Sequence, residues 1–319
     1  MTQFLHPLQS WIPYKIDIKD DQIFCKWLNT FNKPFVEPFF DETIGRCRAL
    51  DPHVGDFLSV SDLMVLEDWA EGLNTIKPTA FIFHISRCGS TLVSQLLGVN
   101  AHNISLAEVP FFDDILRLHF NKAEFDKAKT GRLFTDAIKF YGQKRNGKET
   151  DLFIKADSWH VFFYEQIREL YPDVPFIFLY RKPDEVLSSH QKRRGMQAVP
   201  GLIEPELFGF NREETLQMNQ DVYTAKIIES YFSKYLEIIG EDKLSLFLNY
   251  NIGILPIIEK VASFINLEIR DDEFSVMALR SQYHSKYPDA TFSEKPVSIA
   301  DEYLDTAFGL YRKLVEIAG

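Results

Sequence analysis

The sequence predicts a three-layer α/β fold built on a central, mostly parallel sheet. Short segments of almost wholly apolar residues recur along the chain, and longer segments with helical periodicity separate them. Strands that are apolar on both faces are typical of parallel sheets covered by helices on both sides. Their alternation with helices predicts a layered α/β architecture. With 319 residues, of which 45% are hydrophobic, the chain is long enough to bury a large core.

The core is expected to follow a strand-and-helix order. The apolar and helical patterns predict strands at residues 79–85, 151–156, 174–180 and 243–249, and helices at residues 89–97, 183–194 and 253–265. A closing helix is expected from just after Pro296 to about residue 317, because proline is favoured in a first helical turn.

Two regions depart from this alternation. Residues 1–75 are expected to be mostly helical and irregular, and residues 111–148 to form charged helices with a break near Thr130. Both are candidates for a lid or for recognition of a second substrate, and peripheral packing is the alternative. We interpret the chain as a single domain over residues 1–319, in which residues 1–75 extend an α/β core at residues 76–319.

Composition excludes several classes of protein. The net charge of −11 disfavours nucleic acid and anionic membrane surfaces as partners. The three cysteines are far apart and predict no disulfide framework, and no Cys/His group has metal-ligand spacing. The N-terminus does not resemble a signal peptide, and the apolar runs fall far below the ~20 residues of a membrane helix. We therefore expect a cytoplasmic protein without a membrane span.

The most informative segment is a turn between a strand and a helix at residues 81–97 (FIFHISRCGSTLVSQLL). Free amides at a helix start and the helix dipole make an anion site. Gly89 allows close approach of the backbone, Ser90 and Thr91 add hydroxyl donors, and Arg87 adds a fixed positive charge. An ordinary capped turn is the alternative interpretation.

A comparison with the loop that binds nucleoside triphosphates limits which anions this turn could bind. In the pattern G-x-x-x-x-G-K-[ST], placing Gly89 on the second glycine puts Ser90 at the lysine and His84 at the first glycine. The lysine that holds the β- and γ-phosphates is therefore missing. The loop suits a shorter anion that needs no Mg²⁺.

A second anion site is predicted at the end of the strand at residues 174–180. Arg181 lies at the carboxyl end of this strand, where open α/β sheets bind ligands. Ser189 and Arg193 are four residues apart and are expected to share one helix face. Together the three residues could hold a second phosphate, whereas Lys192 and Arg194 are interpreted as a solvated basic helix end.

These two segments together resemble the sulfotransferase superfamily over roughly residues 81–194. Arg87, Cys88, Gly89, Ser90 and Thr91 are similar to its 5′-phosphosulfate loop, with Cys88 in place of the usual serine. Arg181, followed eight residues later by Ser189, is similar to the family's 3′-phosphate motif. Arg193 falls where tyrosylprotein sulfotransferases carry a further arginine for the same phosphate.

The resemblance implies a P-loop NTPase-like fold, 3′-phosphoadenosine 5′-phosphosulfate (PAPS) as co-substrate and no metal. Two departures stand out. Leu92 occupies the place of a tryptophan that stacks on adenine in cytosolic members, so the ring must come from elsewhere; Tyr231 and Phe232 are candidates, and both fit equally well as core helix residues. A glycine-rich Arg-Lys-Gly loop is missing near the C-terminus, where the nearest basic residues are His284, Lys286 and Lys295.

Sulfonate transfer needs an aligned acceptor, a base and positive charge on the departing phosphate. The resemblance implies that Arg87 and Lys155 supply the charge, although Lys155 reads equally well as a solvated lysine at a strand end. Glu108, 21 residues after Arg87, matches the place of the catalytic Glu in tyrosylprotein sulfotransferases, and apolar neighbours are expected to raise its pKa. Asp157, which overlays the His of a Lys-x-His pattern, and His160 compete for the role of base.

Three other functions stay open. They are a P-loop kinase or phosphotransferase, a non-catalytic nucleotide-binding relative, and an α/β scaffold for protein partners. For the favoured function, the acceptor is a small molecule, glycan, lipid or peptide that the sequence does not identify.

Overall fold

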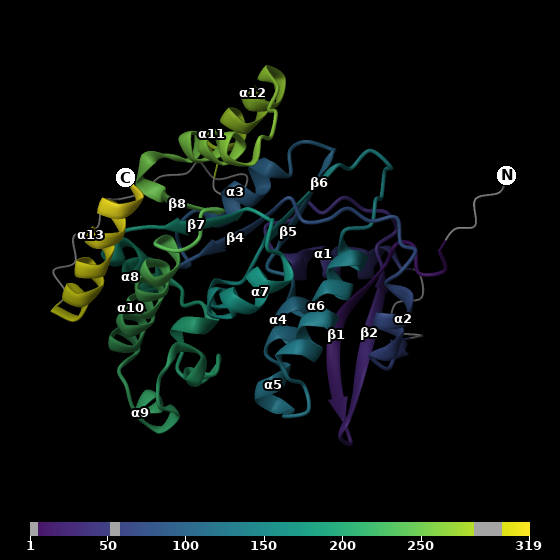
Figure 1. Cartoon of the computed structure of the whole chain (residues 1–319), viewed down its shortest axis with the longest axis horizontal. Coiled ribbons are helices and arrows are strands. Elements are labelled where there is room, and N and C mark those ends of the chain that lie inside the picture. Colours follow the sequence, from purple (N-terminus) through teal and green to yellow (C-terminus); the bar gives the residue numbers. More distant parts are fainter. Residues whose placement is uncertain (1–5, 52–57, 284–301) are drawn as a thin grey trace.

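A computed structural model describes residues 6–51, 58–283 and 302–319. Its centre is a five-stranded sheet in the order β5-β6-β4-β7-β8, in which all neighbouring strands are parallel. The strands are β4 (Ala80–His84), β5 (Asn103–Ala107), β6 (Asp151–Lys155), β7 (Phe176–Tyr180) and β8 (Ser245–Asn249). The predicted α/β class with a central parallel sheet is confirmed (Figure 1).

Helices cover both faces of this sheet. Figure 1 shows α3 (Ser90–Leu97) and α11 (Ile254–Ile265) on one side and α7 (Tyr164–Leu170) and α10 (Gln220–Ile239) on the other. The remaining helices of the core are α8 (Pro183–Lys192), α12 (Asp271–Arg280), the short α9 (Arg212–Leu216) and α13 (Asp305–Ala318). The predicted helices at residues 89–97, 183–194 and 253–265 correspond to α3, α8 and α11. The expected start of the closing helix near Pro296 lies outside the described residues.

Aromatic rings hold the middle of the sheet together. All five residues of β4 and of β7 are buried, as expected for strands covered on both faces. The ring of Phe178 stacks on Phe83 at 5.1 Å and on Phe247 at 4.5 Å between centroids, which joins β4, β7 and β8. Such cross-strand pairs fix the register and therefore place the carboxyl ends of these strands side by side.

The strand β5 is missing from the sequence prediction. Asn103 and Ser105 interrupt its apolar run, which conceals the strand pattern. Ser105 is nevertheless buried, because its hydroxyl lies 2.8 Å from that of Ser94 on α3. This paired hydroxyl allows a polar residue inside an otherwise apolar layer.

The prediction of a mostly helical region at residues 1–75 is wrong. β1 (Trp11–Lys19), β2 (Gln22–Asn29) and β3 (Ser59–Ser61) form an antiparallel sheet, accompanied by α1 (Phe40–Leu50) and α2 (Met64–Trp69). Asp20 and Asp21 both adopt positive φ, 49° and 61°, and make a two-residue hairpin turn. Asp tolerates this left-handed conformation better than most residues, so the turn folds without glycine.

The break expected near Thr130 is also wrong. Residues 110–141 form α4 (Pro110–Leu116), α5 (Leu118–Asn121) and α6 (Lys127–Tyr141), so the interruption falls before residue 127. Asp126 caps α6 by accepting from the amide of Lys129 at 2.8 Å. Thr130 stays helical because its hydroxyl bonds back to the Asp126 carbonyl at 3.0 Å.

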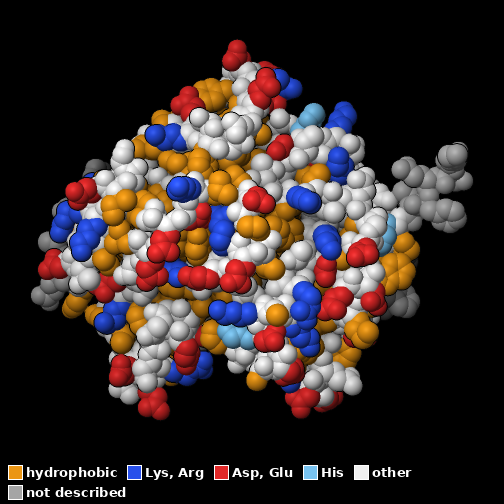
Figure 2. Space-filling model, viewed as in Figure 1, with side chains coloured by type: hydrophobic (Ala, Val, Ile, Leu, Met, Phe, Trp, Pro, Cys, Tyr) orange, Lys and Arg blue, Asp and Glu red, His pale blue; other side chains and the backbone are white. Residues whose placement is uncertain are grey.

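The surface of the described chain is of mixed character. On the face shown in Figure 2, hydrophobic, acidic and basic side chains are interspersed. Among the helices that the structure describes, each is too short or too polar to cross a bilayer.

Candidate active site

The predicted site residues gather at one edge of the sheet. The phosphate loop follows β4, Glu108 follows β5, Lys155 ends β6 and Arg181 follows β7. Because these four strands are parallel neighbours, their carboxyl ends meet at the same edge. The structure therefore brings together residues that lie up to 94 positions apart in the chain.

The phosphate loop is a left-handed turn. Ser86, Arg87 and Gly89 have positive φ values of 69°, 54° and 78°, and α3 begins at Ser90. A Cβ atom on Gly89 would lie 2.3 Å from Cε2 of Tyr250, so only glycine fits. Ser90 and Thr91 are buried at the start of α3, where the first amides of the helix have no intrahelical partner.

Arg87 and Arg181 meet across the loop. The guanidinium of Arg181 donates to the carbonyl of Arg87 at 3.3 Å and to Glu185 at 2.5 Å, and it lies 4.6 Å over the ring of Tyr250. Arg87 donates to the carbonyl of Arg193. Burial lowers the pKa of Arg87, and the charge of Arg193 lowers it further. The two arginines that the sequence predicts to bind phosphate thus lie within one site.

Arg193 lies beside Arg87, which donates to its carbonyl, but Ser189 and Arg193 are not both helical as the sequence predicted. α8 ends at Lys192, and Arg193 has an extended backbone, with φ at −155°. The two residues therefore do not share a helical face, although the Arg193 amide still donates to the Ser189 carbonyl at 3.2 Å. Arg194, interpreted as solvated, instead forms an ion pair with Asp221 that ties the end of α8 to α10.

Lys155 is buried and paired. Its side chain has no exposed surface, and its ammonium donates to Oε1 of Glu108. His84 Nε2 lies 3.3 Å from the same oxygen and 3.1 Å from the carbonyl of Ala156. A solvated strand-end lysine is therefore the wrong description.

The expected rise in the pKa of Glu108 is also wrong. Burial alone would raise this pKa, but the charge of Lys155 and the hydrogen bond from His84 hold it well below its usual range. A carboxylate is stabilised in its charged form by a close cation and by hydrogen bonds to that form. Glu108 is consequently ionised at neutral pH.

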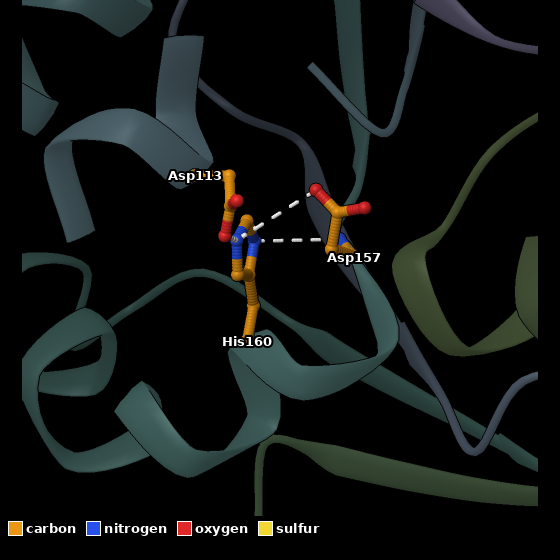
Figure 3. A group of neighbouring side chains, drawn as sticks. All are labelled: Asp113, Asp157 and His160. Atoms are coloured by element: carbon orange, nitrogen blue, oxygen red, sulfur yellow. Dashed lines mark hydrogen bonds and ion pairs between the residues drawn. The ribbon is translucent and has the colours of Figure 1, made fainter. Parts of the chain in front are cut away.

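Asp157 belongs to a second cluster, with His160 and Asp113 (Figure 3). His160 Nε2 lies 3.0 Å from Asp113 Oδ1 and 3.7 Å from Asp157 Oδ2. Burial raises the pKa of Asp157 well above its usual value, and the charges of Glu108 and Asp113 add to the effect. His160 and Asp157 also cap the 3₁₀ helix Ser158–Phe163 reciprocally.

The donor atoms of this cluster lie within 4.8 Å of one another, a spacing that would admit a cation. Asp113, however, already accepts from Arg117 at 2.7 Å and from the indole of Trp159 at 2.6 Å. The cluster is therefore satisfied by protein groups, and we interpret it as a hydrogen-bonded support for Asp157.

A cavity of about 370 Å³ adjoins the phosphate loop. Its lining is Leu92, Glu185, Tyr250, Asn251, Gly253, Ile254 and Ser281. Tyr231 and Phe232, the candidate stacking residues, are only 1% and 0% exposed, so they are core residues, which is the alternative that the sequence left open. Tyr250 is the ring that lines the cavity. The signal for it was an aromatic residue directly after an apolar strand. His284, Lys286 and Lys295 lie outside the described residues.

The N-terminal region contributes to the same site. The ring of Phe39, just before α1, lies 5.6 Å from the Lys155 ammonium. The pKa of Asp41, in the first turn of α1, is raised by burial and by the charge of Glu108. The sequence predicted residues 1–75 as a candidate region for recognition of a second substrate, with an aromatic patch at Phe35–Phe40 that contains Phe39, but it did not single out Asp41.

Comparisons with known proteins identify one matching family and a similar fold. Residues 78–200 match a family model described as the sulfotransferase family, and no curated protein matches the chain. The sulfotransferase domain from the curacin biosynthetic pathway has a TM-score of 0.51 and 15% identity, over 76% of this chain and 98% of that one.

Two further solved structures are similar at lower scores. The sulfotransferase domain from the Synechococcus PCC 7002 olefin synthase has a TM-score of 0.48 and 13% identity, over 77% of this chain and 97% of that one. Mouse sulfotransferase SULT7A1, solved in complex with PAP, has a TM-score of 0.36 and 11% identity, over 96% and 93% of the two chains. The sequence match over residues 78–200 and the fold shared with the curacin domain support the sulfotransferase superfamily as the family of this chain.

Proposed function

We propose that this chain transfers a sulfonate group from PAPS to a hydroxyl or amine acceptor. The observation that carries the proposal is the meeting of Arg87 and Arg181 at one sheet edge, beside a buried Lys155. One adenine nucleotide with phosphates at both ends of its ribose would use both arginines. The family match supports the reaction class.

In this proposal the nucleotide spans the loop and the cavity. The amides at the start of α3 and the side chains of Arg87, Ser90 and Thr91 hold the 5′-phosphosulfate. Arg181, Ser189 and Arg193 hold the 3′-phosphate. The adenine lies in the 370 Å³ cavity, where Tyr250 supplies the aromatic surface.

The chemistry is an in-line displacement at sulfur. The acceptor oxygen or nitrogen forms a new bond to sulfur while the bond from sulfur to the bridging phosphate oxygen breaks. The departing 3′-phosphoadenosine 5′-phosphate (PAP) gains negative charge, which Arg87 and Lys155 neutralise. The acceptor's proton passes to Glu108, which is ionised and therefore ready to receive it.

Asp157 is the second candidate for the base. Its pKa is raised above the usual value, whereas that of Glu108 is lowered, and a general base works best when its pKa is near the operating pH. Glu108 retains the stronger geometric case, because it contacts the lysine proposed to act on the leaving group. Phe39, whose ring lies 5.6 Å from the Lys155 ammonium, and Asp41 on the following helix are the residues of the N-terminal region that we propose to contact the acceptor.

The decisive experiment is a transfer screen with ³⁵S-labelled PAPS across phenols, sugars, lipids, amines and tyrosine peptides. Arg87→Ala should abolish transfer and weaken PAP binding. Glu108→Gln should abolish transfer and retain PAP binding, and Asp157→Asn should retain transfer. Near-normal turnover in Glu108→Gln together with an inactive Asp157→Asn would move the base to Asp157.

Thermal shift separates this function from a kinase. A ligand at 100 times its Kd stabilises the folded state by about 2.7 kcal/mol, so a binding nucleotide raises the melting temperature. PAPS and PAP should raise it, and ATP with Mg²⁺ should not. The opposite pattern would favour a phosphotransferase, and no shift with any nucleotide would favour a scaffold.

A further inference from the structure

His84 is a buried ionisable residue in a strand of apolar neighbours. It ends β4 and is 4% exposed, between Phe83 and Ile85. A buried imidazole is costly unless both ring nitrogens have hydrogen-bond partners. Both have them here, and the two partners lie in different parts of the site.

The contacts of the ring define its tautomer. Nδ1 lies 3.1 Å from the backbone N–H of Ser86. An amide only donates, so Nδ1 carries no proton and the neutral ring bears its proton on Nε2. That N–H faces the carboxylate of Glu108 at 3.3 Å and the carbonyl of Ala156 at 3.1 Å.

The two contacts reach residues with strained backbone: the amide of Ser86 on one side and the side chain of Glu108 on the other. Ser86 and Arg87, on the Nδ1 side, have positive φ values of 69° and 54°. Glu108, on the Nε2 side, has φ at 54°. Non-glycine residues keep this conformation only where the surroundings hold them in it. One ring therefore supports both the anion loop and the carboxylate.

We propose that His84 is a positioning residue that couples the phosphate loop to Glu108. It holds the loop through Nδ1 and orients the carboxylate through Nε2–H. This inference rests on the proposed function, because it assigns the two contacts to nucleotide binding and to turnover. In this proposal His84 acts through Ser86 and Glu108 and contacts neither the nucleotide nor the acceptor.

The charged groups around the ring are consistent with a neutral imidazole. Glu108 approaches from the end of β5 and Lys155 from β6, with Asp157 beyond them. Burial lowers the pKa of His84, the charge of Lys155 lowers it further, and Glu108 opposes both. A protonated ring would turn Nδ1 into a donor and lose the Ser86 contact.

Two substitutions separate the two contacts. In His84→Asn the amide oxygen takes roughly the place of Nδ1, so the loop contact is kept and the Glu108 contact is lost. In His84→Gln the amide nitrogen takes roughly the place of Nε2, so the reverse holds. His84→Ala loses both contacts. Ser105→Ala, on β5 of the same sheet, is the matched control for loss of a buried polar group.

The expected results are opposite for the two variants. Loss of an outer-shell partner typically costs about 10- to 100-fold in the function it supports. His84→Asn should therefore lower kcat by about that factor and leave the Kd for PAP within about twofold of the wild type. His84→Gln should weaken PAP binding about tenfold and leave kcat at saturating PAPS within about threefold. Equal losses of both functions in Asn and Gln variants that melt like Ser105→Ala would overturn the proposal.

A second measurement does not depend on activity. Imidazole ¹⁵N NMR of the ligand-free protein, with His84→Gln used to assign the signal among eight histidines, should show the Nε2–H tautomer. A proton on Nδ1 at pH 7.5 would overturn the proposal even if the variants lose function. If the wild type binds no PAP, the proposed function fails, and the NMR result still decides whether His84 holds Ser86.

Discussion

The ion pair between Lys155 and Glu108 makes a prediction about stability that is independent of substrate. The side chain of Lys155 has no exposed surface and that of Glu108 is 22% exposed. Glu108→Gln removes the negative charge and keeps the shape, so a buried ammonium is left without its counter-charge. Removing one partner of a buried ion pair typically costs about 3–5 kcal/mol.

The magnitude should fall at the lower end of that range. The glutamine oxygen can still accept from Lys155, and the site is open to water on the Glu108 side. We expect a loss of about 3 kcal/mol in the free energy of unfolding. For a chain of 319 residues that corresponds to a fall of about 4–5 °C in melting temperature.

A double-mutant cycle tests the reasoning. Lys155→Met removes the ammonium and fills a similar volume, so the double variant Glu108→Gln/Lys155→Met should be more stable than Glu108→Gln alone. Melting temperatures of the four proteins are measured by calorimetry at pH 7.5 without ligand. If the changes in stability caused by the two single substitutions simply add, Lys155 and Glu108 do not interact, and the stabilising ion pair between them is refuted.

The pH dependence of the same cycle has a defined sign. The folded-state pKa of Glu108 lies below its unfolded value, so its contribution to stability is present above the unfolded value, 4.5, and is lost as the pH falls through the folded pKa. The stability gap between wild type and Glu108→Gln should therefore stay constant from pH 8 to about pH 5 and narrow only below that. A gap that closes between pH 8 and pH 6 would show that another group titrates.

Three further predictions follow from single residues. Asp114 accepts from the amide of Ile16 at 2.9 Å, and burial raises its pKa to about 6. Since the folded pKa exceeds the unfolded one, stability is lost as the pH rises through about 6, and Asp114→Asn should raise the unfolding free energy at pH 8 by up to about 3 kcal/mol but not at pH 3.5; equal gains at both pH values would contradict this. Gly89→Ala should lower the melting temperature and abolish PAP binding, because the added methyl meets Tyr250 at 2.3 Å, and the Tyr250→Ala background should restore part of the stability; an unchanged melting temperature would refute the fit. Arg181→Ala should weaken PAP about 10- to 100-fold but leave adenosine 5′-phosphosulfate, which lacks the 3′-phosphate, unaffected in calorimetric titration; equal losses for both ligands would remove Arg181 from the 3′-phosphate site.

The sequence was most informative where local chemistry decides the structure. A run of five buried residues followed by glycine and hydroxyl residues specifies a strand, a tight turn and a helix start, as in β4, the phosphate loop and α3. The strand-end position of Arg181 follows from the same reasoning. These features predicted that the two arginines lie on one sheet edge, because parallel neighbours share their carboxyl ends.

Long-range packing decided the rest. Lys155 reads equally well as a solvated or a functional residue, and what separates the two is burial against Glu108 and Phe39, which come from other strands and from the N-terminal region. The same packing reversed the expected pKa of Glu108. Apolar neighbours in the sequence predicted a rise, but a cation supplied by the adjacent strand outweighs them. Local composition does not determine the sign of a pKa shift when the strongest charge lies 47 residues away.

His84 illustrates why a departure from a known pattern can carry information. At the position of the first glycine in a triphosphate loop, its side chain had no assigned role in the sequence. In the structure it fills the space beneath the loop and bonds to both Ser86 and Glu108. A loop without the usual lysine has lost one of its anchors to the anion. A ring that fixes the loop backbone reduces the conformational entropy that the loop loses when a ligand binds. His84 therefore offsets, by holding the loop in one conformation, the loss of the binding energy that the missing lysine would have supplied.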